Sequence, residues 1–492
     1  MVRPHARSLR RLLAGVAGSV IAFPGAAVVP AAAAVVMHPT VSDFVQINSS
    51  TTPPTEAQCE SVGRRCFTPQ AIQSAYHVGP LYAQGINGKG ITIAIVDSFG
   101  SDTIAHDLHV FDQAFGLQPM CGEEGVTCTA GMPKFSQLHV QGSPPTNSIP
   151  GQSNSTFQET HSLWALEVSL DVETAHAMAP MANILLVTTP TAETLGVQGF
   201  PDMMKAEKFV VDNHLASVIS QSFASAEDAF GSFQSLLNLR DAYVAAAANG
   251  VTVLGSSGDS GTANVQKQPP KVTPLIPFPT VEWPASDPLV TGVGGTYLCT
   301  NPTAKTNDPR TVTAGPGGQC PRFPTEAEVG WKFAGGGFSH VFSKPAYQNT
   351  LPAGSTPIDG MRGVPDIGLQ ASAGTGALVF ISLPPDGNAG LFCGATPCST
   401  GWYDIGGTSL SCPQWAALVA MADQLHGGGL GLINPKLYAL ASSKYAADFF
   451  DVTTGNNTAN PSVPGFPATK GWDPITGLGT PNAANLVKDL AA

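Results

Sequence analysis

Short apolar segments that do not alternate with polar residues recur through the first half of the chain, and helical segments separate them. Strands are expected at residues 91–96, 184–187, 218–223 and 251–254, and helices at 102–115, 161–178, 202–214 and 233–249. Uninterrupted apolar strands are typical of a parallel sheet that is buried on both faces. We therefore predict an α/β fold with a mostly parallel central sheet, helices on both faces, and functional residues at the carboxyl ends of the strands.

Two stretches are predicted to lack regular structure. Residues 35–67 form a polar, irregular lead, and residues 269–322 are rich in proline, glycine and polar side chains, which is typical of a long loop or insertion.

The composition indicates a large, weakly charged core. Charged residues make up 12% of the chain, against about 25% in average soluble domains, whereas 43% of the residues are hydrophobic. The formal net charge of −12 provides no electrostatic reason to bind nucleic acid or an anionic membrane.

The N-terminus has the pattern of an export signal. Four arginines among the first eleven residues precede the apolar run 12–22, and small residues end at Ala34. We predict a signal peptide over residues 1–34 and a secreted, extracellular mature protein. A membrane anchor is the alternative, but Pro24 and Pro30 interrupt the run before it reaches the ~20 residues needed to span.

The cysteines favour local disulfides in an exported chain. Close neighbours in sequence are Cys59 with Cys66, Cys121 with Cys128, Cys299 with Cys320, and Cys393 with Cys398. The connectivity stays open from sequence alone, and a zinc site lacks any C-x-x-C spacing to support it. Cys412 lies in an apolar run and is predicted to be a buried, unreactive thiol.

A glycine-rich turn leads into a helix at Ser409. The segment 406–413 reads Gly-Gly-Thr-Ser-Leu-Ser-Cys-Pro. The glycines allow a tight turn, and free N–H groups at a helix N-terminus stabilise negative charge. Pro413 cannot donate to the carbonyl of Ser409, so the first turn is loosened there. Ser409 is a candidate nucleophile, and an ordinary serine N-cap is the alternative.

Two carboxylates share one stripe of the helix expected at 161–178. Glu167 and Asp171 are four residues apart, between Trp164 and Met178 on the same stripe. Such a pair repels, and partial desolvation raises at least one of the two pKa values, which produces a base that is useful in acid. A solvated acidic helix face is the alternative. A third acid, Asp259, follows the strand at 251–254 inside Gly-Asp-Ser-Gly, which is also good turn chemistry.

Together these segments resemble the sedolisin family of serine-carboxyl peptidases. Glu167-x-x-x-Asp171, Gly258-Asp259 and Gly407-Thr408-Ser409 match its catalytic motifs in type, order and approximate spacing, and residues 68–78 and 90–97 extend the likeness. The resemblance implies a subtilisin-like three-layer fold over residues 68–492. It also implies an enzyme that hydrolyses peptide bonds in acid.

The resemblance assigns a role to each of four residues. Ser409 attacks the scissile carbonyl, and Glu167 takes its proton and later delivers it to the leaving amine. Asp171 orients Glu167, and a protonated Asp259 donates to the oxyanion beside the Ser409 backbone N–H. The expected substrates are peptides or denatured proteins, and the expected state is a monomer.

Three alternatives remain within this interpretation. One is an ordinary subtilisin using Asp97, but no His-Gly-Thr run opening a helix accompanies it. We therefore expect Asp97 to be structural or adjacent to substrate. The second is a tripeptidyl-type aminopeptidase of the same family, instead of an endopeptidase. The third is an inactive secreted binding protein on this fold.

The C-terminal region resembles the calcium site of the same family. The resemblance implies one structural Ca²⁺, held by the side chains of Asp451 and Asp473 and by the carbonyls of Val452, Thr469 and Gly471. Asx-turns at the two aspartates are the alternative. Sedolisins are typically made with a long inhibitory propeptide, whereas here only residues 35–67 lie between the expected signal cleavage and the catalytic region.

Overall fold

The computed structural model describes residues 38–39, 43–143, 154–190, 199–266, 274–313, 315, 320–383, 392–393 and 396–492, without the side chains of 38–39, 154–160, 321, 392–393 and 396–397. We call these the described residues. The predicted signal peptide, residues 1–34, lies outside them.

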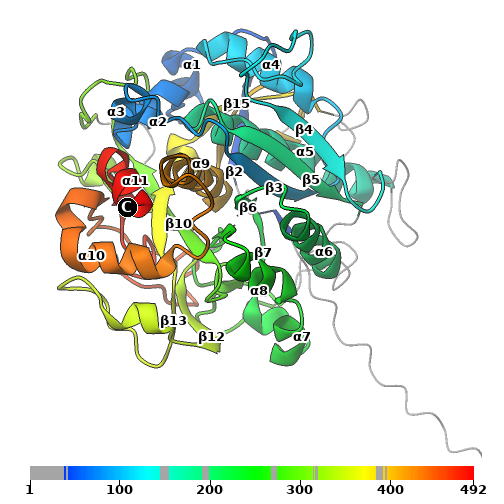
Figure 1. Cartoon of the computed structure of the whole chain (residues 1–492). Coiled ribbons are helices and arrows are strands. Elements are labelled where there is room, and N and C mark those ends of the chain that lie inside the picture. Colours follow the sequence, from blue (N-terminus) through cyan, green and yellow to red (C-terminus); the bar gives the residue numbers. More distant parts are fainter. Residues whose placement is uncertain are drawn as a thin grey trace, which may run out of the picture. The chain divides into compact units, whose positions relative to one another are not determined.

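The central sheet has the strand order β11-β10-β8-β6-β3-β5-β4, and β14 also pairs with β10 (Figure 1). The bounds are β3 (Thr92–Ser98), β4 (Phe135–His139), β5 (Asn183–Thr189), β6 (Val218–Gln221), β8 (Thr252–Ser256), β10 (Thr291–Leu298), β11 (Glu328–Gly330) and β14 (Ile367–Gln370). Every pairing among these strands is parallel except that of β10 with β11. The predicted mostly parallel sheet is confirmed.

Helices cover both faces of this sheet, as Figure 1 shows. On one face lie α5 (Asn154–Met178) and α9 (Thr408–His426), and on the other α6 (Gly199–Asp212) and α8 (Asp241–Ala248). The side chains of β3 alternate between the two layers. Ile93 joins the apolar cluster that includes α5 and α9, whereas Ala94 joins the cluster of α6 and α8. The predicted three-layer α/β fold is therefore confirmed.

The remaining elements surround these layers. The helices are α1 (Glu56–Ser61), α2 (Pro69–Ala75), α3 (Gly79–Tyr82), α4 (Ile104–Phe115), α7 (Phe233–Leu237), α10 (Asn434–Asp448) and α11 (Ala483–Ala491). The shorter strands are β1 (His38–Pro39), β2 (Asp43–Asn48), β7 (Phe223–Ala226), β9 (Glu282–Trp283), β12 (Gly337–Ser343), β13 (Met361–Val364), β15 (Ala377–Ile381), β16 (Phe392–Cys393), β17 (Thr396–Pro397), β18 (Gly401–Gly406), β19 (Phe449–Phe450) and β20 (Thr480–Pro481). No helix in the described part of the chain combines the length and hydropathy needed to cross a lipid bilayer.

The stretch 269–322, predicted as a loop, contains the central strand β10, so this prediction is wrong in that part. The glycines that suggested a loop are there because the strand packs too closely for side chains. A Cβ on Gly294 would lie 2.2 Å from the carbonyl oxygen of Ile475, and one on Gly295 would lie 2.5 Å from the Cβ of Ala371. Glycine in a strand marks such close approach.

Two other predictions need correction. The single helix expected at 233–249 is divided into α7, which ends at Leu237, and α8, which begins at Asp241. Between them, Arg240 binds Asp287 through two hydrogen bonds of 2.5 and 2.8 Å. The predicted irregular lead contains β1, β2 and α1. Thr55 and Gln58 form a capping box at the start of α1, which stabilises this short helix.

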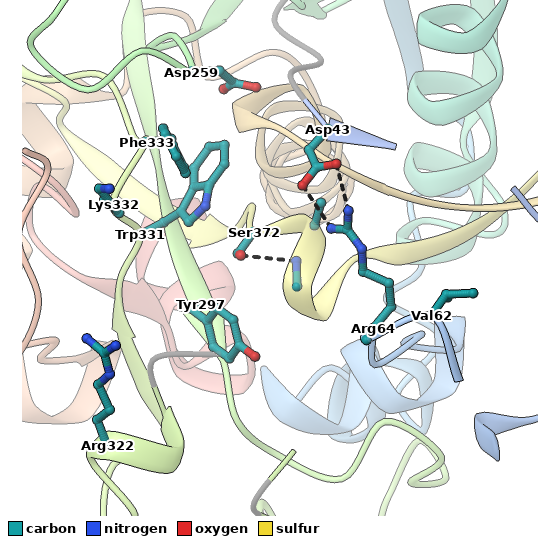
Figure 2. Close-up of a pocket in the computed structure, with 13 residues that line it drawn as sticks. Asp43, Val62, Arg64, Asp259, Tyr297, Arg322, Trp331, Lys332, Phe333 and Ser372 are labelled. Atoms are coloured by element: carbon teal, nitrogen blue, oxygen red, sulfur yellow. Dashed lines mark hydrogen bonds and ion pairs between the residues drawn. The ribbon is translucent and has the colours of Figure 1, made fainter. Parts of the chain in front are cut away.

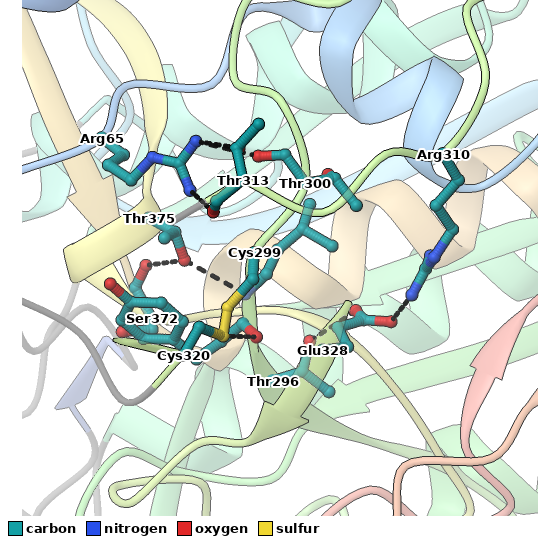
Figure 3. The surroundings of a disulfide bond; sticks show 12 residues. Arg65, Thr296, Cys299, Thr300, Arg310, Thr313, Cys320, Glu328, Ser372 and Thr375 are labelled. Atoms are coloured by element: carbon teal, nitrogen blue, oxygen red, sulfur yellow. Dashed lines mark hydrogen bonds and ion pairs between the residues drawn. A yellow bond between two sulfur atoms is a disulfide. The ribbon is translucent and has the colours of Figure 1, made fainter. Parts of the chain in front are cut away.

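Disulfides join three of the expected cysteine pairs, Cys59–Cys66, Cys121–Cys128 and Cys299–Cys320. The last pair ties the end of β10 to a neighbouring loop (Figure 3). Cys398 is also disulfide-bonded, but the side chain of its expected partner Cys393 lies outside the description. Cys412 is a buried free thiol, as predicted.

Candidate active site

Helix α5 carries Glu167 and Asp171 with their side chains fully buried. The Ser222 hydroxyl donates to Oδ1 of Asp171 over 3.0 Å. Burial raises the pKa of Glu167 well above its ordinary value, the charges of Asp97 and Asp259 raise it further, and the Ser409 and Ser222 hydroxyls oppose the rise. The predicted stripe of paired carboxyls therefore faces the protein interior and not solvent.

Asp97 is a third buried acid next to this pair. It lies near the carboxyl end of β3, and burial raises its pKa to about 8. Its charge is the second-largest cause, after burial, of the raised pKa values of both Glu167 and Asp171. The structure thus places Asp97 against the carboxyl pair. Three buried acids this close cannot all ionise together, so the cluster retains protons to higher pH than isolated carboxyls do.

Ser409 lies in the first turn of α9, directly after β18. The residue at the N-cap is Gly407, with φ of +143°, and it makes no side-chain cap. Ser409 is therefore not an ordinary serine N-cap, which removes that alternative. The turn is also crowded: a Cβ on Gly406 would meet the backbone nitrogen of Ala373 at 2.1 Å. Pro413 lies inside the helix, where its nitrogen cannot donate to the carbonyl of Ser409.

Thr408, the residue before Ser409, holds Asp259 beside the serine. Its Oδ1 accepts hydrogen bonds from the backbone N–H of Thr408 over 2.7 Å and from the Thr408 hydroxyl over 2.9 Å. The Thr408 hydroxyl in turn accepts from the N–H of Gly258 over 3.0 Å. A proton on this carboxyl therefore belongs on Oδ2. Gly258 has φ of +102°, and a Cβ there would collide with the Glu282 carboxyl.

A cavity of about 780 Å³ opens next to Asp259 (Figure 2). One wall carries Trp331 and Phe333, and the opposite side carries Arg64, which binds Asp43 through two hydrogen bonds of 2.7 and 2.9 Å. Aromatic walls with a few polar groups are typical of a site for an extended organic ligand.

The four predicted catalytic residues come together from three separate parts of the chain. Glu167 contributes from α5, Asp259 from the loop after β8, and Ser409 from α9. The sequence did not predict two side chains that contact these residues: Ser222, which contacts Asp171, and Thr408, which contacts Asp259. Ser222 directly follows β6, so the rule that functional residues lie at the carboxyl ends of parallel strands could have found it.

The five predicted calcium ligands also lie together. Oδ1 of Asp451 accepts from the Tyr445 hydroxyl over 2.9 Å and from the N–H of Gly471 over 3.0 Å. Asp473 is fully buried, and its Oδ2 accepts from the N–H of Thr469 over 3.3 Å. Its Oδ1 accepts from the N–H groups of Ile475 and Thr476 over 2.8 and 3.0 Å, so the Asx-turn given as the alternative is present at this aspartate. Val452 directly follows Asp451.

The fold is a subtilisin-like α/β fold. Its serine at a helix N-terminus, next to a buried pair of carboxyls, is typical of the serine-carboxyl hydrolases. The chain is 30% identical over 440 residues to kumamolisin of Bacillus sp. (strain MN-32), covering 88% of this chain and 65% of that protein. It is 30% identical over 348 residues to tripeptidyl-peptidase 1 of Rattus norvegicus, covering 66% and 52%. Pseudomonas sedolisin, solved in complex with two molecules of pseudo-iodotyrostatin, superposes with a TM-score of 0.61 at 25% identity, covering 86% of this chain and 97% of that one.

The chain belongs to the sedolisin family of serine-carboxyl peptidases. It spans about half to two-thirds of the length of the curated relatives it matches. No family model matches the chain.

Proposed function

We propose that the chain is a serine-carboxyl peptidase that hydrolyses peptide bonds in acid. The observation that carries this proposal is the joint placement of Ser409 next to Glu167 and of Asp259 next to Thr408. These contacts put a hydroxyl beside a base, and an acid beside the residue that directly precedes the same serine. They are the minimum arrangement for acyl transfer.

In the proposed reaction, Oγ of Ser409 attacks the carbonyl carbon of the scissile bond while Glu167 takes the hydroxyl proton. The oxyanion that forms accepts hydrogen bonds from the protonated Oδ2 of Asp259 and from the Ser409 backbone N–H. Glu167 then gives its proton to the leaving amine, which departs and leaves an ester on Ser409. Water attacks this ester with Glu167 again as base, and the serine is released.

Asp171 positions Glu167 in this scheme. It does not touch the substrate, and Ser222 fixes it through the hydrogen bond to Oδ1. Burial, and then the charges of Asp97 and Asp259, raise the pKa of Glu167, so Glu167 holds the proton taken from the serine until it passes to the leaving amine.

Hydrolysis of a denatured protein is expected to peak below pH 5 and to fall by at least tenfold by pH 8. Donation by Asp259 requires its proton, and above about pH 8, where Asp97 ionises, negative charge accumulates in the cluster. The rate is measured on one denatured substrate from pH 3 to 8. A neutral or alkaline maximum would contradict the carboxyl mechanism.

The melting temperature measured over the same range separates loss of catalysis from unfolding. Burial raises the pKa values of Asp97 and Glu282 to about 8. Between the unfolded value near 4 and about 8 the folded state binds more protons, so this contribution to stability is complete in acid and is lost as pH rises. The protein should therefore still be folded where activity peaks.

We further propose endopeptidase action, with tripeptidyl aminopeptidase action as the second candidate, because several relatives are named tripeptidyl-peptidases. Peptides with a free or an acetylated N-terminus distinguish the two. An endopeptidase cleaves both at internal bonds, whereas a tripeptidyl peptidase releases tripeptides from the free form only.

We also propose one structural calcium ion at Asp451 and Asp473. Within the described residues neither carboxyl forms an ion pair, although Asp473 is fully buried with a pKa raised to about 7 by that burial. In the described part of the chain, no group of three or more acidic, histidine or cysteine side chains is arranged so that it could hold a metal ion. The expected set has only two acidic side chains, and backbone carbonyls complete it, so the donors fit a hard cation.

Removing calcium is expected to lower the melting temperature by several degrees, since binding to the folded state alone stabilises it. The measurement is a thermal melt at pH 6 with and without EDTA, followed by calcium addition to restore the original melt. The variant Asp451→Asn should melt at the lower temperature and be insensitive to EDTA. An identical melt for the wild type in both solutions would contradict calcium binding.

Export remains part of the proposal, with residues 1–34 as signal peptide, 35–67 as a short N-terminal segment and 68–492 as the peptidase domain. The disulfides support an oxidising compartment. We propose that the mature protein is a monomer acting on peptides or denatured proteins.

A further inference from the structure

The cavity next to Asp259 is lined by a tyrosine whose hydroxyl forms no hydrogen bond within the described residues (Figure 2). This tyrosine is Tyr297 of β10, and it is only 4% exposed. Buried polar groups in native proteins are nearly always hydrogen-bonded, so a buried hydroxyl without a protein partner requires an explanation. Because Tyr297 lines a cavity, its hydroxyl is a ready donor to a ligand that enters this cavity.

Two cations of the same cavity, Arg322 and Lys332, form no ion pair within the described part of the chain. The third cation, Arg64, is already matched by Asp43 through two hydrogen bonds. The whole chain has only 23 lysines and arginines against 35 acidic residues. Two unmatched cations in one cavity are therefore a local excess of positive charge in an acidic protein.

A disulfide holds two of these groups in place. Cys320, two residues before Arg322, is bonded to Cys299, two residues after Tyr297 (Figure 3). Tyr297 and both cysteines belong to one buried apolar cluster. The hydroxyl and the guanidinium are thus attached to a braced part of the fold, which lowers the entropy that a ligand must remove when it binds.

The acids near this cavity leave its positive charge in place at acid pH. Asp43 is matched by Arg64, and Asp259 holds a proton in the proposed reaction. Asp404, whose charge acts on Arg64, is fully buried, and burial raises its pKa well above the ordinary value, so it also keeps its proton in acid. The two unmatched cations therefore give the cavity a net positive charge where the peptidase is proposed to work.

We propose that this cavity is a specificity subsite for a carboxylate of the peptide substrate. Arg322 and Lys332 attract the carboxylate, and the Tyr297 hydroxyl donates a hydrogen bond to it. This inference rests on the proposed peptidase function and adds a substrate class to it: peptides with a carboxylate near the scissile bond. The carboxylate can belong to an acidic side chain or to the C-terminus of the peptide, and the test distinguishes these two sources.

The test compares peptides that differ in one carboxylate only. In an internally quenched peptide with one cleavable bond, glutamate is placed in turn at each position on either side of this bond, and every such peptide has a glutamine partner. A further pair has a free or an amidated C-terminus. We measure kcat/KM at pH 5, where side chains of pKa ~4.3 and terminal carboxyls of pKa ~3.5 are mostly ionised. Mass spectrometry verifies which bond is cleaved.

We expect glutamate at one position, or the free C-terminus, to raise kcat/KM about tenfold over the neutral partner, as a hydrogen bond to a charged group can. The double variant Arg322→Gln with Lys332→Gln should bring this ratio close to one. Tyr297→Phe removes only the hydroxyl and should lower the ratio about threefold. Lys436→Gln changes an exposed cation of α10 outside the cavity, and this matched control should keep the full ratio. A thermal melt verifies that each variant is folded.

The subsite and the peptidase function fail in different ways. Equal kcat/KM for every carboxylate peptide and its neutral partner would overturn the subsite, while the observed hydrolysis upholds the peptidase. A preference that Arg322→Gln with Lys332→Gln leaves unchanged would also overturn it. Binding of the same peptides to full-length Ser409→Ala protein, measured by fluorescence anisotropy, is a readout without hydrolysis. Tighter binding of a carboxylate peptide there, with no hydrolysis of any peptide by the wild type, would uphold the subsite and overturn the peptidase function.

Discussion

Replacing Ser409 with alanine is expected to lower kcat/KM for peptide hydrolysis by a factor on the order of 10⁴ or more, because no other group in the site supplies the attacking oxygen. The side chain is fully buried, and the change removes one oxygen atom, so the melting temperature should shift by only a few degrees. Initial rates on a fluorogenic peptide at pH 4 provide the measurement.

Ser411→Ala is the matched control for this change. Ser411 is a buried serine in the same helix, and its hydroxyl donates to the carbonyl of Gln370 over 3.0 Å, outside the proposed machinery. This variant should retain activity within about a factor of three. A peptide that binds to both wild type and Ser409→Ala, with hydrolysis by neither, would instead favour the inactive binding protein.

Glu167→Gln is expected to lower kcat by about 10²–10⁴, with little change in KM. The amide has nearly the shape of the carboxyl but cannot take the serine proton. It also removes the Glu167 charge that helps to raise the pKa of Asp171, so the pKa of Asp171 should move toward its ordinary value. Full rate-against-concentration curves at pH 4 separate kcat from KM.

Glu173→Gln controls for the same substitution in the same helix. Glu173 is fully buried, and its Oε2 accepts from the N–H of Phe380 over 3.0 Å, an interaction that the glutamine oxygen preserves. A loss of kcat in Glu167→Gln no greater than that in Glu173→Gln would remove Glu167 from its role as base.

Local sequence patterns were sufficient to predict much of the fold. The apolar runs that became β3, β5, β6 and β8 are buried on both faces because helices cover both sides of a parallel sheet, and that burial requires apolar residues at every position. The same reasoning misjudged β10. Its glycines resemble a loop in sequence, and only the proximity of Ile475 and Ala371 explains why a central strand needs them.

The candidate site was likewise predicted in part from the sequence and in part became visible only in the structure. Spacing along one helix was enough to predict that Glu167 and Asp171 share a face, since four residues make about one turn. It could not predict that Asp97, 70 residues earlier in the chain, would lie against them and hold a proton to about pH 8. That effect depends on burial and on distances across the sheet, and neither is a property of a local segment.

What the sequence determined by itself was therefore the type and order of the chemistry: a parallel α/β frame, a serine at a glycine turn, a carboxyl pair and a third acid. The tertiary structure alone decided how these groups meet. It placed Thr408 between Asp259 and Ser409, buried three acids together, and paired the N-terminal strand β1 with β7. The physical reason is that hydrogen-bond partners and desolvation arise from groups distant in sequence, which periodicity and composition do not specify.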